Sequence, residues 1–390
     1  MNIAISCLTL QLDNIGGLQY RLKNLIEGFC ERGHTVKIVQ SPFAYKGSRL
    51  FYEKVEEYKV EPIIIPHNIN KKIKPMDLLR MYNYKVFDIL DKYHIDILDT
   101  YDPYIRIPKK HIPMIYSTNY FLPYIYNQIY YGGFKNSFFH ILKVICEQVT
   151  IINSDSIIVE NKNQKNWLNK WMNISNTKIN VILPGYDENM VHAVNKSGFN
   201  SNVNEETRII FVGRITYLKG VFELLDAFNN VNKSSKNHKL FYVGDGPDKK
   251  KLETIAKKRG ISENVKFIGE RSQVETIKII NQSDIVVLPS YNEGVPLSII
   301  ESMALKKPII ASDVGGISAH LIEDLVNGIL IKPKNVKQLE KALRLVCTDP
   351  EVRIKFGLNS WKKAKNLTNM KMVNDTLQVY EAVYRKSYKI

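Results

Sequence analysis

The sequence predicts an α/β protein built from two doubly wound parallel sheets. Short apolar and β-branched runs alternate with amphipathic stretches of about ten to fifteen residues, and strands separated by such helices pair in parallel. The series occurs twice, on either side of residues 186–208, which are rich in Asn, Ser and charge and poor in apolar residues. We therefore expect two Rossmann-like domains, residues 1–185 and 186–369, with the segment 186–208 as their linker.

The expected strands are short apolar runs bounded by turn residues or charges. In the first domain they are residues 3–7, 35–39, 62–65, 95–98, 114–116, 156–159 and 179–182. In the second domain they are residues 209–212, 240–243, 265–268, 285–288, 308–311 and 328–331. Apolar residues recur at helical spacing in residues 19–32, 76–92, 221–231, 249–259, 274–282 and 336–347. Because ligands bind beyond the carboxyl ends of such strands, we expect a deep cleft where the two domains face each other.

The composition agrees with two globular domains and with a cytoplasmic location. Of the 390 residues, 44% are hydrophobic and 24% are charged, which is enough to build two cores. No run reaches the roughly 18 apolar residues of a membrane span, and the first residues lack the basic region of a signal peptide. The four cysteines lie far apart without a CxxC pair, so they indicate neither a zinc site nor a disulfide framework.

The formal net charge of +16 is spread over both halves of the chain. One interpretation is a lysine-rich, solvated surface without a function. Another is attraction to an anionic membrane surface or to anionic substrates, which would make the protein peripheral at the inner face of the membrane. Nucleic acid is not an expected partner, because no basic and aromatic motif of a known nucleic-acid module is present.

Two cations occupy the turn that follows the predicted strand 209–212. Arg214 and Lys219 lie between Gly213 and Gly220, directly before a predicted helix. Cationic side chains beside the free N–H groups of a helix N-terminus are suited to a diphosphate. A solvated turn would explain the same residues.

Two carboxylates follow the predicted strand 285–288. Glu293 falls in the loop SYNEGVP, and Glu301 falls eight positions later in an otherwise apolar helix that opens near Pro296. Gly294 lets backbone approach a ligand, and the helix N-terminus offers the N–H groups of Leu297 and Ser298 to a phosphate. Carboxylates also accept hydrogen bonds from paired sugar hydroxyls. The alternative interpretation is a helix-terminal charge and an exposed helical glutamate.

The spacing Glu293-x7-Glu301, together with GRxxxxKG at residues 213–220, resembles the motifs of the retaining family 4 glycosyltransferases of the GT-B fold. The resemblance extends to FYVGDGPDKKKLE (241–253), VKFIGERS (265–272), ASDVGGI (311–317) and NGILIKP (327–333) in the second domain. In the first domain it includes Gly16–Gly17 before a helix, ERGHTVKIV (31–39) and VILPGYD (181–187). The last helix, residues 370–390, resembles the family helix that returns to pack on the first domain. The resemblance thus implies acceptor binding by residues 1–185 and donor binding by residues 186–369.

The resemblance implies roles for individual residues. Arg214 and Lys219 would neutralise the donor diphosphate, and Glu293 would contact hydroxyls of the donor sugar. Glu301 would hold the ribose. The remaining implied donor contacts come from backbone or small residues, namely Gly16, Gly17, Gly213, Gly244, Arg271, Ser272, Gly294, Val295, Pro296, Leu297 and Ser298. Of these, Gly244 belongs to a Gly-x-Gly without the third glycine of a dinucleotide fingerprint, a pattern more typical of a strand-to-helix turn.

One departure from the family concerns residue 119. The family usually has a histidine in a Thr-x-His pattern after the strand near residue 116, and this chain has Ser117-Thr118-Asn119. Asn119 is therefore expected to take the histidine's place. An asparagine can hydrogen-bond a sugar hydroxyl but has no proton-transfer capacity near neutral pH.

We expect no metal and no cofactor besides the nucleotide-sugar co-substrate. The eight histidines form no HxxxH or HExxH pattern, and no Asp-x-Asp stands where it would face the cleft. The expected acceptor is a saccharide or a lipid-linked sugar. The aromatic residues of 120–145 are suited to a core, to sugar faces or to a membrane interface, and lysines in the same domain (Lys71, Lys72, Lys74, Lys109 and Lys110) are compatible with a lipid-linked acceptor.

The predicted function is transfer of a sugar, with retention, from a UDP- or GDP-linked donor to a hydroxyl acceptor in cell-surface polysaccharide or glycolipid synthesis. Two alternatives stay open. One is another enzyme on this scaffold, such as a nucleotide-sugar epimerase or a phosphorylase. The other is an inactive basic protein that binds membranes or polyanions.

Overall fold

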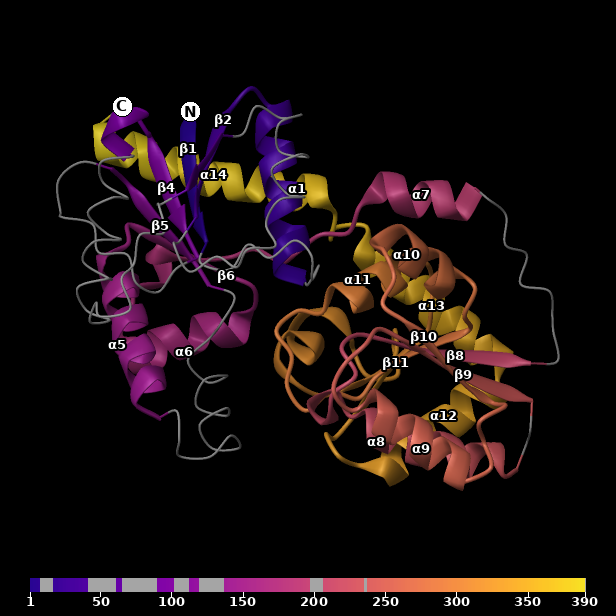
Figure 1. The fold of residues 1–390 in the computed structure, drawn as a ribbon. Coiled ribbons are helices and arrows are strands. Elements are labelled where there is room, and N and C mark those ends of the chain that lie inside the picture. The colour runs from indigo at the N-terminus through magenta and orange to yellow at the C-terminus, as the bar shows by residue number, and fades with distance from the viewer. Residues whose placement is uncertain are drawn as a thin grey trace. The chain divides into compact units, whose positions relative to one another are not determined.

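A computed structural model describes residues 1–7, 17–40, 61–64, 90–101, 112–118, 137–196, 206–234 and 237–389. The chain divides into two compact units, one made of Met1–Leu183 with Met370–Ile390 and the other of Pro184–Asn369 (Figure 1). The chain thus leaves unit 1 at Leu183 and returns to it at Met370.

Unit 1 contains a seven-stranded sheet in the order β3-β2-β1-β4-β5-β6-β7, with every pairing parallel. The strands are β1 (Asn2–Cys7), β2 (Thr35–Gln40), β3 (Glu61–Ile64), β4 (Ile97–Thr100), β5 (Met114–Ser117), β6 (Ser156–Val159) and β7 (Ile179–Val181). The described helices are α1 (Gly17–Glu31), α5 (Ser137–Asn153), α6 (Lys162–Met172) and α14 (Asn369–Tyr388), with a 3-10 turn at Asn176–Lys178. The strand order reverses between β1 and β4, so the sheet is doubly wound.

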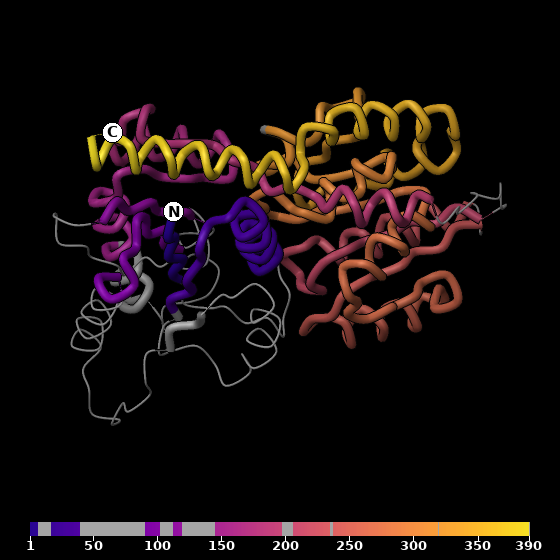
Figure 2. The backbone as a smooth tube through the Cα atoms, turned by 90° about the horizontal axis from the view of Figure 1, so that it is seen from above, coloured from indigo at the N-terminus to yellow at the C-terminus, as the bar shows by residue number. Residues whose placement is uncertain are grey.

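The C-terminal helix α14 is part of the core of unit 1. Its buried residues, including Val373 and Tyr380, share one apolar cluster with Ile3 and Phe29. Helix α1 crosses α14 (Figures 1 and 2), and a Cβ at Gly28 of α1 would lie 2.6 Å from Val373 Cγ2. The Tyr380 hydroxyl donates a 2.5 Å hydrogen bond to the buried Asp99 carboxylate at the end of β4. The absence of a side chain at Gly28 therefore allows the two helices to approach closely.

Unit 2 contains a six-stranded parallel sheet in the order β10-β9-β8-β11-β12-β13. The strands are β8 (Thr207–Val212), β9 (His238–Val243), β10 (Val265–Gly269), β11 (Ile285–Leu288), β12 (Ile309–Ser312) and β13 (Ile329–Ile331). The helices are α7 (Glu188–Lys196), α8 (Val221–Asn232), α9 (Lys249–Lys258), α10 (Gln273–Asn281), α11 (Leu297–Ala304), α12 (Val336–Thr348) and α13 (Pro350–Ala364), with short turns at Tyr217–Lys219 and Ile317–Leu321. The predicted α/β class, with two doubly wound parallel sheets, is confirmed.

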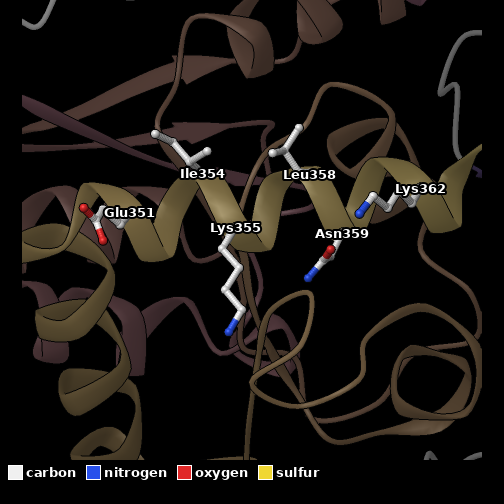
Figure 3. Close-up of a pocket in the computed structure, with 6 residues that line it drawn as sticks. All are labelled: Glu351, Ile354, Lys355, Leu358, Asn359 and Lys362. Atoms are coloured by element: carbon white, nitrogen blue, oxygen red, sulfur yellow. The ribbon is translucent and has the colours of Figure 1, made fainter.

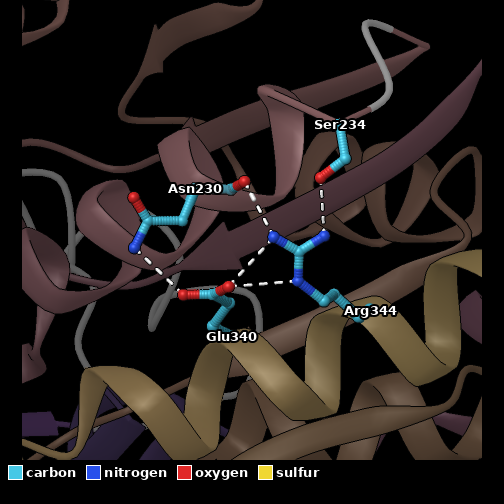
Figure 4. A network of polar contacts seen from close by, with 4 residues as sticks. All are labelled: Asn230, Ser234, Glu340 and Arg344. Carbon is cyan, nitrogen blue, oxygen red and sulfur yellow. Dashed lines mark hydrogen bonds and ion pairs between the residues drawn. The ribbon is translucent and has the colours of Figure 1, made fainter.

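Helices α8 and α12 are joined by a polar network on the surface of unit 2 (Figure 4). The Arg344 guanidinium donates to Glu340 at 2.9 Å, to the Ser234 hydroxyl at 2.7 Å and to the Asn230 carbonyl at 3.0 Å. The Asn230 amide donates to the second Glu340 oxygen at 3.0 Å. The network therefore holds α8 and α12 against each other.

The predicted linker 186–208 is wrong in its first half, because it contains helix α7. Asp187 accepts a hydrogen bond from the Met190 N–H, and Val191 and Val194 are buried. Two apolar residues three positions apart are enough to dock a short helix against α10, although the segment as a whole is polar. The predicted helix 76–92 lies outside the described residues except for its last three.

Candidate functional site

The candidate site of unit 2 lies at the switch point between β8 and β11. These two strands pair directly, with Ile285 beside Ile209, and the strand order reverses there. Residues 213–220 follow the carboxyl end of β8, and residues 289–296 follow the carboxyl end of β11. The topology therefore brings the loop with the predicted cations beside the loop with Glu293.

Lys219 and Glu293 form an ion pair in these two loops. The Lys219 Nζ lies 2.5 Å from Glu293 Oε1, and the Ser290 hydroxyl donates to the same oxygen at 2.6 Å. The Glu293 side chain is 9% exposed and that of Lys219 is 30% exposed. A carboxylate so little exposed requires hydrogen-bond partners, and these two donors supply them. Ser290 was not among the residues predicted from the sequence.

Tyr291 braces the same two loops. Its N–H donates to the Leu218 carbonyl at 2.8 Å, and its hydroxyl donates to Glu223 in the first turn of α8. Burial, and then the Glu223 carboxylate, raise the pKa of the Tyr291 hydroxyl, so it remains a hydrogen-bond donor at neutral pH. Sequence reasoning did not identify this brace, because its partners are distant in sequence.

Close backbone approach also shapes the loops. Gly220 has φ +66, and a Cβ there would lie 2.0 Å from the Pro289 carbonyl oxygen. Gly315 has φ +52, and a Cβ there would lie 1.9 Å from the Glu293 carbonyl oxygen. The Gly316 N–H donates to the Gly294 carbonyl at 2.8 Å. The loop after β12 therefore packs directly against the backbone of the Glu293 loop.

The two loops and the start of α11 also contain the other predicted residues. Arg214 is exposed in the loop after β8, and the described contacts do not join it to Glu293. Pro296 precedes α11, and Leu297 and Ser298 begin it, so their N–H groups belong to the first turn, which has no intrahelical acceptors. Val295, in the loop after β11, is 8% exposed.

Glu301 is 4% exposed in α11, which excludes the interpretation as an exposed helical residue. The Gln273 side-chain amide donates to Glu301 Oε1 at 2.7 Å. Burial raises the pKa of Glu301 to about 7, the Gln273 hydrogen bond acts to lower it, and the charge of Asp187 raises it.

The remaining predicted donor contacts have structural partners of their own. Ser272 caps α10, where its hydroxyl accepts from the Glu275 N–H, and Arg271 beside it is exposed. Gly244 lies against the loop after β8, since a Cβ there would be 2.1 Å from the Gly213 carbonyl oxygen. A glycine is therefore needed at residue 244, because the two backbone segments approach each other too closely for a side chain.

In unit 1, Gly17 begins α1 and is exposed. Gly16, Asn119, residues 120–136 and the five predicted lysines Lys71, Lys72, Lys74, Lys109 and Lys110 lie outside the described residues. Over the part of the chain that the structure describes, no three or more His, Cys, Asp or Glu side chains gather in a way that could hold a metal ion. Over the same part, no helix is both long and apolar enough to cross a membrane.

A shallow groove lies along the exposed face of α13 (Figure 3). Its lining residues are Glu351, Ile354, Lys355, Leu358, Asn359 and Lys362. They all come from one helix, and none of them was predicted as a site residue. The groove is therefore separate from the candidate site at the switch point.

Two family models match the chain. Residues 15–189 match Glycosyltransferase Family 4, and residues 195–363 match Glycosyl transferases group 1. The chain is 29% identical over 255 residues to D-inositol 3-phosphate glycosyltransferase of Corynebacterium kroppenstedtii, which covers 62% of this chain and 56% of that protein. The chain thus spans little more than half the length of that relative. It is 27% identical to an uncharacterized glycosyltransferase of Methanocaldococcus jannaschii, over 90% of this chain and 89% of that protein.

Solved structures share the fold over nearly the whole chain. Sucrose-phosphate synthase of Thermosynechococcus elongatus superimposes with a TM-score of 0.76 and 17% identity, covering 99% of this chain and all of that one (100%). HepE of Anabaena, solved in complex with UDP-glucose, superimposes with a TM-score of 0.73 and 17% identity, covering 98% of this chain and 100% of that one.

Proposed function

Since the chain belongs to the group 1 glycosyltransferases and has their GT-B fold, we propose that it uses a UDP- or GDP-linked sugar and transfers it with retention of configuration. The observation that carries the proposal is the Lys219–Glu293 pair beside the first turn of α11, at the switch point of unit 2. A cation and a carboxylate pair there, and the first turn of α11, with its N–H groups, follows four residues after Glu293, a combination that suits a sugar diphosphate. The UDP and UDP-glucose complexes of Anabaena HepE support a nucleotide-sugar donor.

In the proposed reaction the acceptor hydroxyl attacks the anomeric carbon on the face that the diphosphate leaves. The bond from the anomeric carbon to the phosphate oxygen breaks, the bond to the acceptor oxygen forms, and the acceptor proton passes to the departing phosphate oxygen. Lys219, Arg214 and the N–H groups of Leu297 and Ser298 stabilise the charge that grows on this oxygen. Glu293 accepts hydrogen bonds from the donor sugar, close to the ring that gains positive charge.

The nucleoside would lie further along the same edge of the sheet. Glu301 accepts hydrogen bonds from the ribose hydroxyls, and the backbone near Arg271 and Ser272 contacts the base. Both carboxyl-bearing positions are held by neighbours in unit 2, Glu293 by Lys219 and Glu301 by Gln273. We assign donor binding to unit 2 on these contacts and acceptor binding to unit 1. Gly16 and Gly17 stay predicted donor-binding residues, and Asn119 stays the residue predicted to take the histidine's place.

The proposed acceptor is a saccharide or lipid-linked sugar of cell-surface polysaccharide or glycolipid synthesis. The net charge of +16 supports peripheral contact with an anionic membrane, where such acceptors reside.

The stereochemistry tests the proposed reaction. We expect the first-formed product to have the anomeric configuration of the donor, because attack and departure share one face of the sugar. NMR of the anomeric proton of the transferred sugar, recorded on the first-formed product, measures this configuration. An inverted product would exclude both the same-face mechanism and the retaining assignment. Nucleoside diphosphate release that depends on added acceptor would separate transfer from epimerisation.

We also expect turnover without a divalent metal. Lys219 and Arg214 supply the positive charge that a metal would otherwise bring to the diphosphate. The initial rate after exhaustive treatment with EDTA and gel filtration should stay within about twofold of the untreated rate. A complete loss of activity that magnesium or manganese restores would show that the two cations are not sufficient.

A further inference from the structure

Gln273 joins two elements that the proposed function uses separately. It is the first residue of α10, directly after Arg271 and Ser272, and its side-chain amide reaches Glu301 in α11 at 2.7 Å. Arg271 and Ser272 are the proposed base contacts and Glu301 is the proposed ribose contact. A single hydrogen bond therefore links the segment beside the base to the carboxylate beside the ribose.

The Glu301 carboxylate has little water to solvate it, because only 4% of the residue is exposed. Among the described residues, the charge that acts on it is that of Asp187, in the segment that leads into α7, and this charge is of the same sign. Burial and Asp187 both favour the protonated acid, which raises the pKa of Glu301 to about 7. The Gln273 hydrogen bond opposes both effects.

We propose that Gln273 is a positioning residue for the donor nucleoside, which keeps Glu301 ionised and turns it toward the ribose hydroxyls. This inference rests on the proposed function, in which Glu301 binds the ribose. The amide occupies Oε1 and leaves Oε2 to accept from the paired hydroxyls. Because the amide is neutral, it supplies a donor without cancelling the negative charge that the hydroxyls bind.

The pH dependence of nucleotide binding follows from this arrangement. A protonated Glu301 accepts hydrogen bonds poorly, so affinity should fall as the pH falls through about 7. Removing the Gln273 hydrogen bond raises the pKa of Glu301 further, so the fall in affinity should begin at a higher pH. At pH 9 a larger fraction of the carboxylate is ionised than at pH 7.5, so the defect of a Gln273 variant should become smaller.

The test compares Gln273→Leu with Gln282→Leu, a matched change at the other end of α10. Calorimetric titrations with UDP and with GDP between pH 6 and pH 9 give the dissociation constants, and melting temperatures verify that each variant is folded. Glu301→Gln is measured alongside, because a glutamine at residue 301 does not titrate. The pH dependence that is left in this variant is that of the diphosphate itself, whose second pKa is near 6. The 2′,3′-dideoxy nucleotides report the part of binding that needs the ribose hydroxyls.

For whichever nucleotide binds, we expect Gln273→Leu to weaken binding about tenfold at pH 7.5 and less at pH 9. Gln282→Leu should bind as the wild type does, and the dideoxy nucleotide should not distinguish Gln273→Leu from wild type. If Glu301→Gln weakens binding but Gln273→Leu matches Gln282→Leu at every pH, the positioning role is wrong and the ribose role of Glu301 stands. If Glu301→Gln does not weaken binding, the ribose role is wrong and the inference falls with it.

Discussion

Replacing Gly220 by alanine is expected to lower the melting temperature of unit 2 by roughly 6–12 °C and to abolish nucleotide binding. At φ +66 an alanine is strained, and its Cβ would lie 2.0 Å from the Pro289 carbonyl oxygen. Strain and overpacking together cost about 3 kcal/mol or more. The clash cannot be relieved by a rotamer change, because the backbone fixes the position of the Cβ and the Pro289 oxygen is a backbone atom. Any relief moves the Lys219 loop away from the Glu293 loop.

Gly260→Ala is the matched control. Gly260 has nearly the same backbone angle, φ +69, but no heavy atom lies within 4 Å of a Cβ built there. We expect a cost of about 1–2 kcal/mol from the backbone alone and unchanged nucleotide affinity. Differential scanning calorimetry gives the melting temperatures of both variants, and calorimetric titration gives their nucleotide affinities. The comparison separates the backbone strain, which both variants have, from the clash, which only Gly220→Ala has. Equal losses of stability in the two variants would show that the approach of Gly220 to Pro289 does not constrain the fold.

Replacing Glu293 and Glu301 by glutamine is expected to impair the enzyme in two different ways. Glu301→Gln weakens contact with the ribose, which changes little during reaction, so the donor KM should rise while kcat stays closer to normal. Glu293→Gln affects the sugar that gains positive charge, so kcat should fall. Each effect should be about 10- to 150-fold, because a hydrogen bond to a charged group contributes roughly 1.5–3 kcal/mol.

Glu293 also holds the two loops together, because it pairs with Lys219. Glutamine at residue 293 would leave Lys219 beside a neutral amide and weaken the contact that joins the two loops. Steady-state kinetics should therefore be accompanied by melting temperatures, with Glu253→Gln on the exposed face of α9 as the control. Equal changes in KM and kcat for Glu293→Gln and Glu301→Gln would contradict the proposed division of roles.

The fold could be predicted from the sequence because several of its strands are buried on both faces. Strands β11 and β12 are fully buried, and β11 appears in the sequence as an uninterrupted apolar run, IVVL at residues 285–288. Predicted ends differ from the structure by a residue or two, as for β4, expected at 95–98 and found at Ile97–Thr100. Helix α7 was missed because only Val191 and Val194 anchor it, which gives too weak a periodicity to detect in a polar segment.

The candidate site could be predicted only in part. Glu293 and Lys219 were visible because charged residues directly after apolar strands have few structural uses. Their pairing over 74 positions could not be read from spacing, because the pairing of β8 with β11 creates it. Gln273 and Tyr291 gave no signal at all, since a neutral polar residue in a loop or first helical turn is ordinary. Their roles follow from contacts with α11 and α8 that exist only after packing.

Calorimetric titration of UDP and GDP into the wild-type protein and Lys219→Met tests the central claim, a diphosphate site at the switch point of unit 2. We predict that one of the two nucleotides binds with one site per chain and that Lys219→Met weakens it about 10- to 150-fold. Lys257→Met, on the exposed surface of α9, should bind as the wild type does. Binding of neither nucleotide, or equal affinity in wild type and Lys219→Met, would contradict the account.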